Sequence, residues 1–315
     1  MRNDSLIRIF SGESNRAFTQ KICDYLKITM GNSKVMRFSE GNTYVKIDEK
    51  VRGQDVYIVQ TIGLDPNNEL VELLFWLDAF KRSGVNSVTA IIPFFGYAKA
   101  DKKDEPRVSI RARVCADCIE VAGVDRIVTM DLHSPQIQGF FKKPVDHLYA
   151  LGMFCDEIKA KMKDEYVIVS PDEGFAKNAR NYANKLGVKL VIANKQRADH
   201  SETAEILGLM GDVAGKDAVI VDDFTISCGT LNETAKLLKE KGARKVIAYV
   251  THGLITDKGI KTVENSVLDE ITVTDTIYNP RIEGCEKIKI LSASTLFGKA
   301  IRIIHEKDSL SDLFD

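Results

Sequence analysis

The stretch VIVDDFTISCGTLNETAKLL, residues 219–238, decides the fold of the second half of the chain. An apolar run, Val219–Val221, is followed at once by two carboxylates, Asp222 and Asp223. A loop of small residues then leads directly into a helical pattern. This strand–turn–helix order is typical of parallel α/β sheets, in which ligands bind at the carboxyl ends of the strands.

The loop in this stretch suits a phosphate group, because N–H groups at a helix start lack partners and lie at the positive end of the helix dipole. Gly229 allows close backbone approach, while Ser227 and Thr230 add hydroxyl donors. Asp222 and Asp223 can accept hydrogen bonds from vicinal sugar hydroxyls. The stretch therefore predicts a sugar-phosphate site; the alternative is a plain turn with Thr230 as the helix cap. Neither G-x-x-x-x-G-K-[ST] nor G-x-G-x-x-G occurs in the chain.

Outward from this unit, short β-branched runs alternate with longer segments of helical period, which predicts doubly wound α/β layers. The near-continuous apolar character of the runs indicates strands buried on both faces of a parallel sheet. We expect strands at Leu6–Phe10, Val56–Gln60, Val88–Ile92, Arg126–Met130, Val167–Val169, Leu190–Ala193, Ala218–Val221, Val246–Val250, Ile271–Val273 and Ile288–Leu291. We expect helices at Arg16–Leu26, Glu69–Ser83, Ile110–Ala122, Leu151–Lys163, Lys177–Leu186, Leu231–Lys241 and Thr295–His305.

Length and composition favour a two-domain cytoplasmic protein. The 315 residues are comfortable for two cores, and a hydrophobic content of 44% with 28% charged residues suits a globular chain. The net charge of −1 gives no indication of bulk binding to nucleic acid or a membrane surface. The first residues contain no apolar core long enough for a secretory signal, and no run approaches roughly 18 apolar residues, so we expect neither a signal peptide nor a membrane span. The six cysteines are scattered, so they do not predict a disulfide framework.

Seven segments, together with the 219–238 stretch, resemble the ribose-phosphate pyrophosphokinase family, whose members have the phosphoribosyltransferase-like fold. They occur in family order and cover nearly the whole chain, and TMDLHSPQIQGFF is specific to this family rather than to the fold. The segments are FSGESN (10–15), VRGQDVYIVQ (51–60), IIPFFGYAKADKK (91–103), TMDLHSPQIQGFFKKPVDHLYA (129–150), VSPDEG (169–174), GDVAGKDAVIVDD (211–223) and VTDTIY (273–278).

The resemblance implies two phosphoribosyltransferase-like domains, each a mainly parallel sheet flanked by helices. The expected N-terminal domain spans residues 1–149, with the tail 304–315 packing on it. The expected C-terminal domain spans residues 150–303 and carries the ribose-phosphate loop. It further implies a homo-oligomer built from dimers, commonly a hexamer; the residues themselves support this only through the broad apolar face at Leu74–Leu77.

Roles for the sugar and metal sites follow from the resemblance. Asp222 and Asp223 match the acids that hold the ribose hydroxyls. The 5-phosphate loop corresponds to Ser227, Cys228, Gly229 and Thr230. Asp172 matches an acid that helps to hold Mg²⁺, and His133 matches the histidine beside the nucleotide phosphates and the metal. Since Mg²⁺ prefers oxygen ligands, the action of His133 through water or directly on phosphate stays open.

Lys195 and Arg197 match the K-x-R spacing of the family's mobile catalytic loop. Phosphoryl-type transfer mainly requires positioning of the reactants and neutralisation of charge in the transition state, which a lysine and an arginine on a closing loop would supply. A merely solvated charged loop is the alternative.

The remaining implied sites are for the nucleotide and for effectors. Phe38 matches an aromatic residue that packs on adenine, and Asn42, Lys99 and Asp101 lie in the other nucleotide-binding segments. An allosteric site for phosphate or ADP would draw on Arg52, Ser83, Ser309, Ser311 and Phe314.

Several departures from the family pattern cluster around the nucleotide. Asn42 replaces an acid, Lys99 replaces an arginine, and Ala100 replaces a glutamine. Lysine gives a point charge where arginine gives a planar pair of donors. In the phosphate loop, Ile226 stands in place of an aspartate.

We therefore expect an Mg²⁺-dependent ribose-phosphate diphosphokinase that uses ATP and ribose 5-phosphate and releases AMP and phosphoribosyl pyrophosphate. A second hypothesis is a weak or inactive paralogue that regulates an active synthase. A third is a phosphoribosyltransferase, which would need a base-binding hood that no segment resembles.

Overall fold

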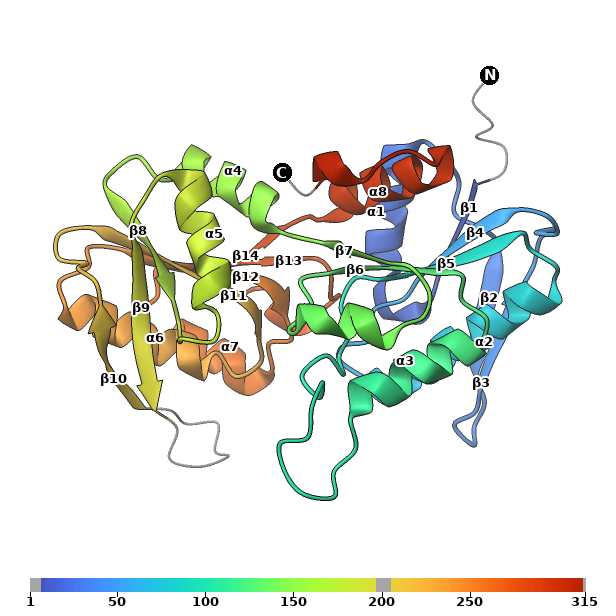
Figure 1. The fold of residues 1–315 in the computed structure, drawn as a ribbon, viewed down its shortest axis with the longest axis horizontal. Helices are drawn as coiled ribbons and strands as arrows, with labels where there is room; N and C mark the ends of the chain where they lie inside the picture. Colours follow the sequence, from blue (N-terminus) through green and yellow to red (C-terminus); the bar gives the residue numbers. More distant parts are fainter. Residues whose placement is uncertain (1–6, 197–204, 314–315) are drawn as a thin grey trace. The chain divides into compact units, whose positions relative to one another are not determined.

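The computed structural model describes residues 7–196 and 205–313. The chain divides into two compact units (Figure 1). The first unit takes in the chain up to Tyr149, Thr276–Tyr278 and the segment from Ser292 onward; the second takes in Ala150–Asp275 and Asn279–Leu291.

The first unit is built, within the described residues, on a five-stranded parallel sheet of order β1-β4-β5-β6-β7. Its strands are largely buried because they are nearly continuous apolar runs. Their bounds are Ile7–Ser11 (β1), Asp55–Val59 (β4), Ser87–Ile92 (β5), Arg126–Met130 (β6) and Val145–Leu148 (β7). A separate antiparallel hairpin joins β2 (Ser33–Arg37) to β3 (Thr43–Ile47).

The helices of the first unit are α1 (Arg16–Leu26), α2 (Pro66–Arg82), α3 (Arg111–Val121) and α8 (Ser294–Glu306), and a 3₁₀ segment, η3, spans Pro135–Phe140. Helix α2 buries Trp76 and Phe80 against Phe10 of β1, with the Phe10 and Phe80 ring centroids 4.9 Å apart. Phe75 stays 41% exposed, so the apolar stripe on α2 is wider than the buried face of this unit requires.

Helix α8 belongs to the first unit, although the sequence-based division assigned its residues up to 303 to the second domain. It packs along α1, where the Phe18 and Phe297 rings meet edge to face at 5.4 Å. The Arg302 guanidinium lies over the Tyr25 ring, 5.2 Å from its centroid. Burial of Phe297 and Ile301 makes this contact apolar as well as cationic.

The second unit has, among the described residues, a seven-stranded sheet of order β10-β9-β8-β11-β12-β13-β14, in which only the β9–β10 pair is antiparallel. The strands are β8 (Tyr166–Ser170), β9 (Leu190–Gln196), β10 (Glu205–Met210), β11 (Asp217–Thr225), β12 (Val246–Gly253), β13 (Glu270–Thr274) and β14 (Ile288–Leu291). The helices are α4 (Leu151–Lys161), α5 (Ala176–Leu186), α6 (Gly229–Glu240) and α7 (Asp257–Glu264).

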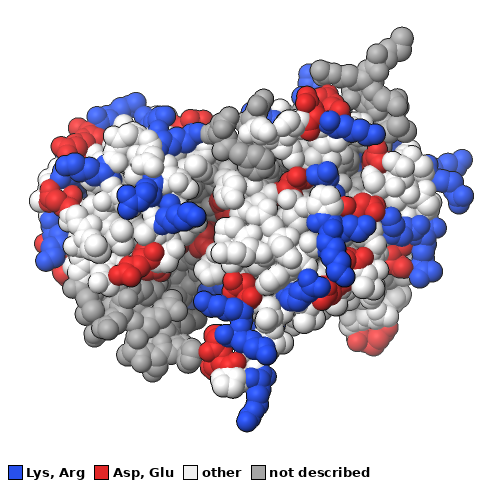
Figure 2. Space-filling model, viewed as in Figure 1, with Lys and Arg blue, Asp and Glu red and all other residues white. Residues whose placement is uncertain are grey.

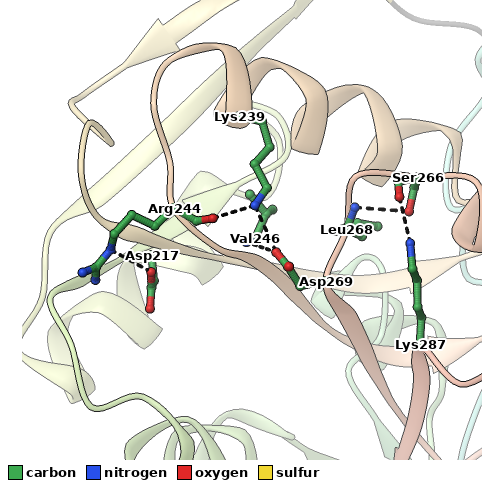
Figure 3. Close-up of polar contacts among 8 residues, drawn as sticks. All are labelled: Asp217, Lys239, Arg244, Val246, Ser266, Leu268, Asp269 and Lys287. Atoms are coloured by element: carbon green, nitrogen blue, oxygen red, sulfur yellow. Dashed lines mark hydrogen bonds and ion pairs between the residues drawn. The ribbon is translucent and has the colours of Figure 1, made fainter.

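Polar contacts fasten the amino ends of the central strands (Figure 3). Oδ2 of Asp269 accepts the backbone N–H of Val246 at 2.7 Å and Nζ of Lys239 at 3.2 Å. The same lysine donates to the carbonyl oxygen of Arg244 at 2.6 Å, and Nε of Arg244 donates to Oδ1 of Asp217 at 3.2 Å. These contacts tie the start of β12 to the turns beside it. The loops at the opposite, carboxyl ends of the strands are where ligands bind in sheets of this kind.

Charges are mixed on the surface shown in Figure 2, where Lys and Arg side chains alternate with Asp and Glu. This fits the net charge of −1. Among the described residues, none of the helices combines the length and the apolar character needed to cross a membrane.

Candidate active site

Strand β11 delivers two adjacent carboxylates to the carboxyl edge of the second sheet. Val219, Ile220 and Val221 are fully buried between β8 and β12, which explains why the strand forms there. Asp222 and Asp223 follow directly on the same strand, and their carboxyl groups interact with one another. Asp222 is half-buried and Asp223 is buried.

Each of the two carboxylates accepts the backbone N–H of the residue that follows it. The distances are 3.0 Å from Asp223 N to Oδ1 of Asp222 and 2.8 Å from Phe224 N to Oδ1 of Asp223. Burial and the negative charges of Asp223 and Asp172 raise the pKa of Asp222 well above its ordinary value. The second unit thus concentrates negative charge at this strand end, where hydroxyl donors or a cation would relieve it.

The loop after β11 ends in a residue with left-handed backbone. Cys228, the residue that precedes α6, has φ 56° and ψ 13°, and its side chain does not cap the helix. Its Sγ accepts the Thr225 hydroxyl at 3.6 Å instead. Burial raises the pKa of the Cys228 thiol to about 11, so the thiol is protonated at neutral pH and is a poor nucleophile. The positive end of the α6 dipole is therefore left to a ligand rather than to a side-chain cap.

Helix α7 supports this loop from behind, a feature that the sequence analysis missed. The backbone N–H of Thr256 donates to the carbonyl oxygen of Ile226 at 3.1 Å. A Cβ atom at Gly259 would lie only 2.5 Å from that same oxygen, so no larger residue fits there without displacing the loop. The signal was the Thr-x-x-Gly spacing, since Oγ1 of Thr256 caps α7 by accepting Gly259 N–H at 3.3 Å.

Asp172 follows β8, the strand next to β11. Its Oδ1 accepts the backbone N–H of Phe175 at 3.0 Å, and Oγ of Ser170 donates to its carbonyl oxygen at 2.7 Å. The charge of Asp172 contributes to the raised pKa of Asp222, which places the two carboxylates within electrostatic reach of one another. The structure therefore gathers Asp172, Asp222 and Asp223 at one strand edge of the second unit.

These carboxylates are oxygen donors of the kind that could hold Mg²⁺ together with a substrate. The described residues contain no group of three or more His, Cys, Asp or Glu side chains arranged to hold a metal ion alone. Mg²⁺ usually keeps several waters and binds through one or two carboxylates plus substrate phosphates. The oxygen donors of Asp172 and Asp222 fit that pattern.

His133 lies in the first unit, at the carboxyl end of β6. Asp131 has a left-handed backbone, with φ 36°, and turns the chain sharply after the strand. Leu132 is buried, whereas the His133 side chain is exposed. The turn thus presents the imidazole outward while anchoring the residue before it.

The nucleotide-binding candidates lie on two other segments of the first unit. Phe38 and Asn42 close the β2–β3 hairpin, where the N–H of Phe38 donates to the Asn42 carbonyl at 2.8 Å. The Phe38 side chain is 45% exposed, so its ring is available for stacking. Lys99 and Asp101 follow β5, and Lys99 is exposed.

The catalytic-loop candidates are described only in part. Lys195 lies on β9, where its backbone pairs with Ile206 of β10. Arg197 lies outside the described residues, as does Phe314 of the expected allosteric site.

Two of the allosteric candidates lie close together in the first unit. A Cβ atom at Gly84, which follows Ser83, would be 3.7 Å from Cγ of Arg52. The N–H of Gly53 donates to the Gly84 carbonyl at 2.9 Å, which joins the two turns. Ser309 and Ser311 share a hydrogen bond of 2.7 Å between their hydroxyl oxygens and are both exposed.

Comparison with protein families identifies both ends of the chain. Residues 7–123 match the N-terminal domain of ribose phosphate pyrophosphokinase, and residues 200–315 match the phosphoribosyl synthetase-associated domain.

Comparison with individual proteins extends the similarity over the full length. A ribose-phosphate pyrophosphokinase of Campylobacter jejuni is 44% identical over 307 residues, 98% of each chain. The one from Porphyromonas gingivalis is 42% identical over 315 residues, covering 100% of this chain and 99% of the relative. A crystal structure of phosphoribosylpyrophosphate synthetase from Mycobacterium smegmatis superposes with a TM-score of 0.89 at 35% identity, covering 96% of this chain and 99% of that one.

Proposed function

This chain belongs to the ribose-phosphate pyrophosphokinase family, and we propose that it transfers the β,γ-diphosphate of ATP to the 1-hydroxyl of ribose 5-phosphate. The products are phosphoribosyl pyrophosphate and AMP. The observation that supports this proposal in the structure is that two carboxylates near the end of β11 are followed closely by α6, which begins four residues after the last residue of the strand and has no side-chain cap. The same turn would thereby bind the hydroxyls of a ribose phosphate through its carboxylates and the phosphate through the start of α6.

The sugar would be held by groups of the second unit. Asp222 and Asp223 would accept hydrogen bonds from the ribose hydroxyls, and each already has one oxygen fixed by a backbone N–H. The N–H groups of the 227–230 loop would bind the 5-phosphate at the positive end of the α6 dipole. Ile226 offers no polar contact to this ligand and is 36% exposed. Backbone amides therefore carry most of the phosphate binding.

Charge at the reacting phosphates would be balanced by side chains from several segments. We propose that Lys195 and Arg197 stabilise the charge that develops on the transferred diphosphate, and that His133 binds phosphate oxygens directly or through water. Asp172 would hold Mg²⁺ beside Asp222. When bound, such an ion neutralises phosphate charge and lowers the pKa of the attacking hydroxyl.

The nucleotide would use Phe38 for stacking and Lys99, Asp101 and Asn42 for polar contacts. We further propose the expected effector site at Arg52, Ser83, Ser309, Ser311 and Phe314, a homo-oligomeric assembly and a cytoplasmic location. The exposed Phe75 and the scattered cysteines, none of them in a disulfide, support the last two points.

The test is AMP release by the purified chain given ATP, Mg²⁺ and inorganic phosphate, with and without ribose 5-phosphate. AMP formation should require the sugar and should fall at least about a hundredfold in Lys195→Ala. Lys236→Ala, on the exposed face of α6, is the matched control and should retain full activity. If the wild type binds ribose 5-phosphate yet makes no AMP, the proposal of an active enzyme is wrong and the hypothesis of a regulatory paralogue takes its place.

A further inference from the structure

A buried histidine, His147, lies on β7 next to the end of β6. Its Cα pairs with that of Thr129 in the parallel ladder, and its side chain is 4% exposed. The Nε2 atom of His147 accepts the backbone N–H of Leu132 at 2.8 Å. Since an accepting ring nitrogen carries no hydrogen, the neutral ring must carry its hydrogen on Nδ1. Nδ1 lies 3.3 Å from the side-chain amide nitrogen of Gln138 on η3.

The hydrogen bond to Nε2 of His147 is important because the chain leaves the sheet after Asp131. The N–H of Asp131 still donates to the Leu148 carbonyl at 3.0 Å, but the left-handed backbone of Asp131 then turns the chain away from β7. Leu132 is buried, so its N–H needs a partner that the strand ladder no longer supplies. The imidazole of His147 supplies it. The Asp131–Leu132 peptide unit, one residue before His133, is thereby fixed to β7.

We propose that His147 is a positioning residue for His133, holding the 131–133 turn so that the His133 imidazole faces the reacting phosphates. This inference rests on the proposed function, in which His133 binds those phosphates. His147 itself is too buried to contact a substrate and acts through the Leu132 amide.

The test is a double-mutant cycle on kcat for AMP formation. His147→Ala should lower kcat about tenfold or more while the KM for ribose 5-phosphate changes less than twofold, because displacement of one catalytic group affects the chemical step first. In a His133→Ala background, the same change should lower kcat no further. His147→Gln places an amide oxygen near the position of Nε2, so it keeps an acceptor for the Leu132 N–H and should recover most of the lost activity. Equal losses in both backgrounds, or no recovery in His147→Gln, would overturn the inference.

Leu148→Val serves as the matched control, because Leu148 is the next residue of β7 and is fully buried but leaves the Leu132 N–H bond intact. Leu148→Val should lower the thermal stability, and its kcat should equal that of the wild type. Amide hydrogen exchange of the 131–134 segment provides a readout that does not need activity. Exchange should accelerate in His147→Ala and not in Leu148→Val. Unchanged exchange would refute the positioning role even if the wild type proved inactive, whereas accelerated exchange in an inactive protein would refute only the proposed function.

Discussion

Oδ1 of Asp222 accepts the backbone N–H of Asp223 at 3.0 Å, so the two carboxylates at the end of β11 are linked through the chain between them. The contact fixes one oxygen of Asp222. It does not offset the burial and the negative charges of Asp223 and Asp172, since the pKa of Asp222 remains well above its ordinary value. The ionised Asp222 carboxylate therefore lowers the stability of the ligand-free protein.

Asp222→Asn should stabilise the metal-free protein while weakening its binding of ribose 5-phosphate. Because burial and neighbouring negative charges raise the folded-state pKa of Asp222, the carboxyl costs no stability below its unfolded pKa; the cost grows as pH rises from the unfolded pKa to the folded pKa and is constant above it. Removing the charge should contribute about 1 kcal/mol at neutral pH, or a Tm increase of about 2–4 °C. Thermal unfolding between pH 4 and 8 would measure it.

The Tm difference between Asp222→Asn and the wild type should shrink toward pH 4. Asp257→Asn, at an exposed carboxylate 3.8 Å from Arg281, is the control and should leave Tm unchanged. A lower Tm for Asp222→Asn at neutral pH would contradict the assignment of strain to this carboxyl.

Gly259→Ala should damage the phosphate loop from behind. The new Cβ would lie 2.5 Å from the Ile226 carbonyl oxygen and 2.8 Å from Cγ2 of Ile255, so the loop or α7 must shift. We expect a stability loss of about 1–3 kcal/mol and a rise of roughly tenfold in the KM for ribose 5-phosphate. Gly152→Ala, in α4, has open space around its Cβ; it should leave the KM for ribose 5-phosphate unchanged and should not lower stability, because alanine is the better helix former. Steady-state kinetics and denaturant unfolding of both variants decide the point.

Alkylation should distinguish Cys118 from the other five cysteines. Cys118 is exposed, whereas Cys23, Cys115, Cys155, Cys228 and Cys285 are buried. Burial also raises the pKa of Cys228 to about 11 and that of Cys115 to about 11, which further slows their reaction. Peptide mapping after brief treatment with iodoacetamide should find the label on Cys118, with activity retained. If iodoacetamide rapidly inactivated a Cys118→Ser variant, the Cys228 thiol would be reactive and the prediction would be wrong.

Lys99→Arg should lower the KM for ATP. An arginine presents two donors in a plane to a phosphate, whereas the lysine gives a single charge, so the variant should bind ATP roughly twofold to tenfold more tightly. The KM for ribose 5-phosphate should stay constant. Lys103→Arg, four residues further along the same exposed segment, is the control. An unchanged KM for ATP would remove Lys99 from the nucleotide site.

The sequence predicts the central strands well because burial on both faces leaves long apolar runs. The expected strand at Val246–Val250 lies inside the observed β12, Val246–Gly253. It misses the hairpin of β2 and β3, whose residues alternate between half-buried and exposed and include several charges. Helix α2 begins at Pro66 rather than Glu69, since proline suits the first position of a helix and the apolar period starts only later.

Long-range placement is what the sequence could not give. The pattern of α8 predicts a helix, but nothing in it shows that Phe297 packs on Phe18 in the first unit. In the site, the strand–turn–helix order predicted β11, the turn after it and α6, which the structure shows, while the roles of Asp222, Asp223 and the loop stay predictions. The Thr-x-x-Gly spacing marks the start of α7, but the contacts that give Gly259 and His147 their supporting roles join segments distant in sequence, which no local pattern shows.

The most direct test of the central claim is ³¹P NMR of the purified chain with ATP, ribose 5-phosphate, Mg²⁺ and inorganic phosphate. Diphosphate transfer predicts that AMP and a sugar bearing a diphosphate at carbon 1 appear in equal amounts, with no ADP. Formation of ADP with a monophosphorylated product, or ATP consumption that does not depend on the sugar, would contradict it.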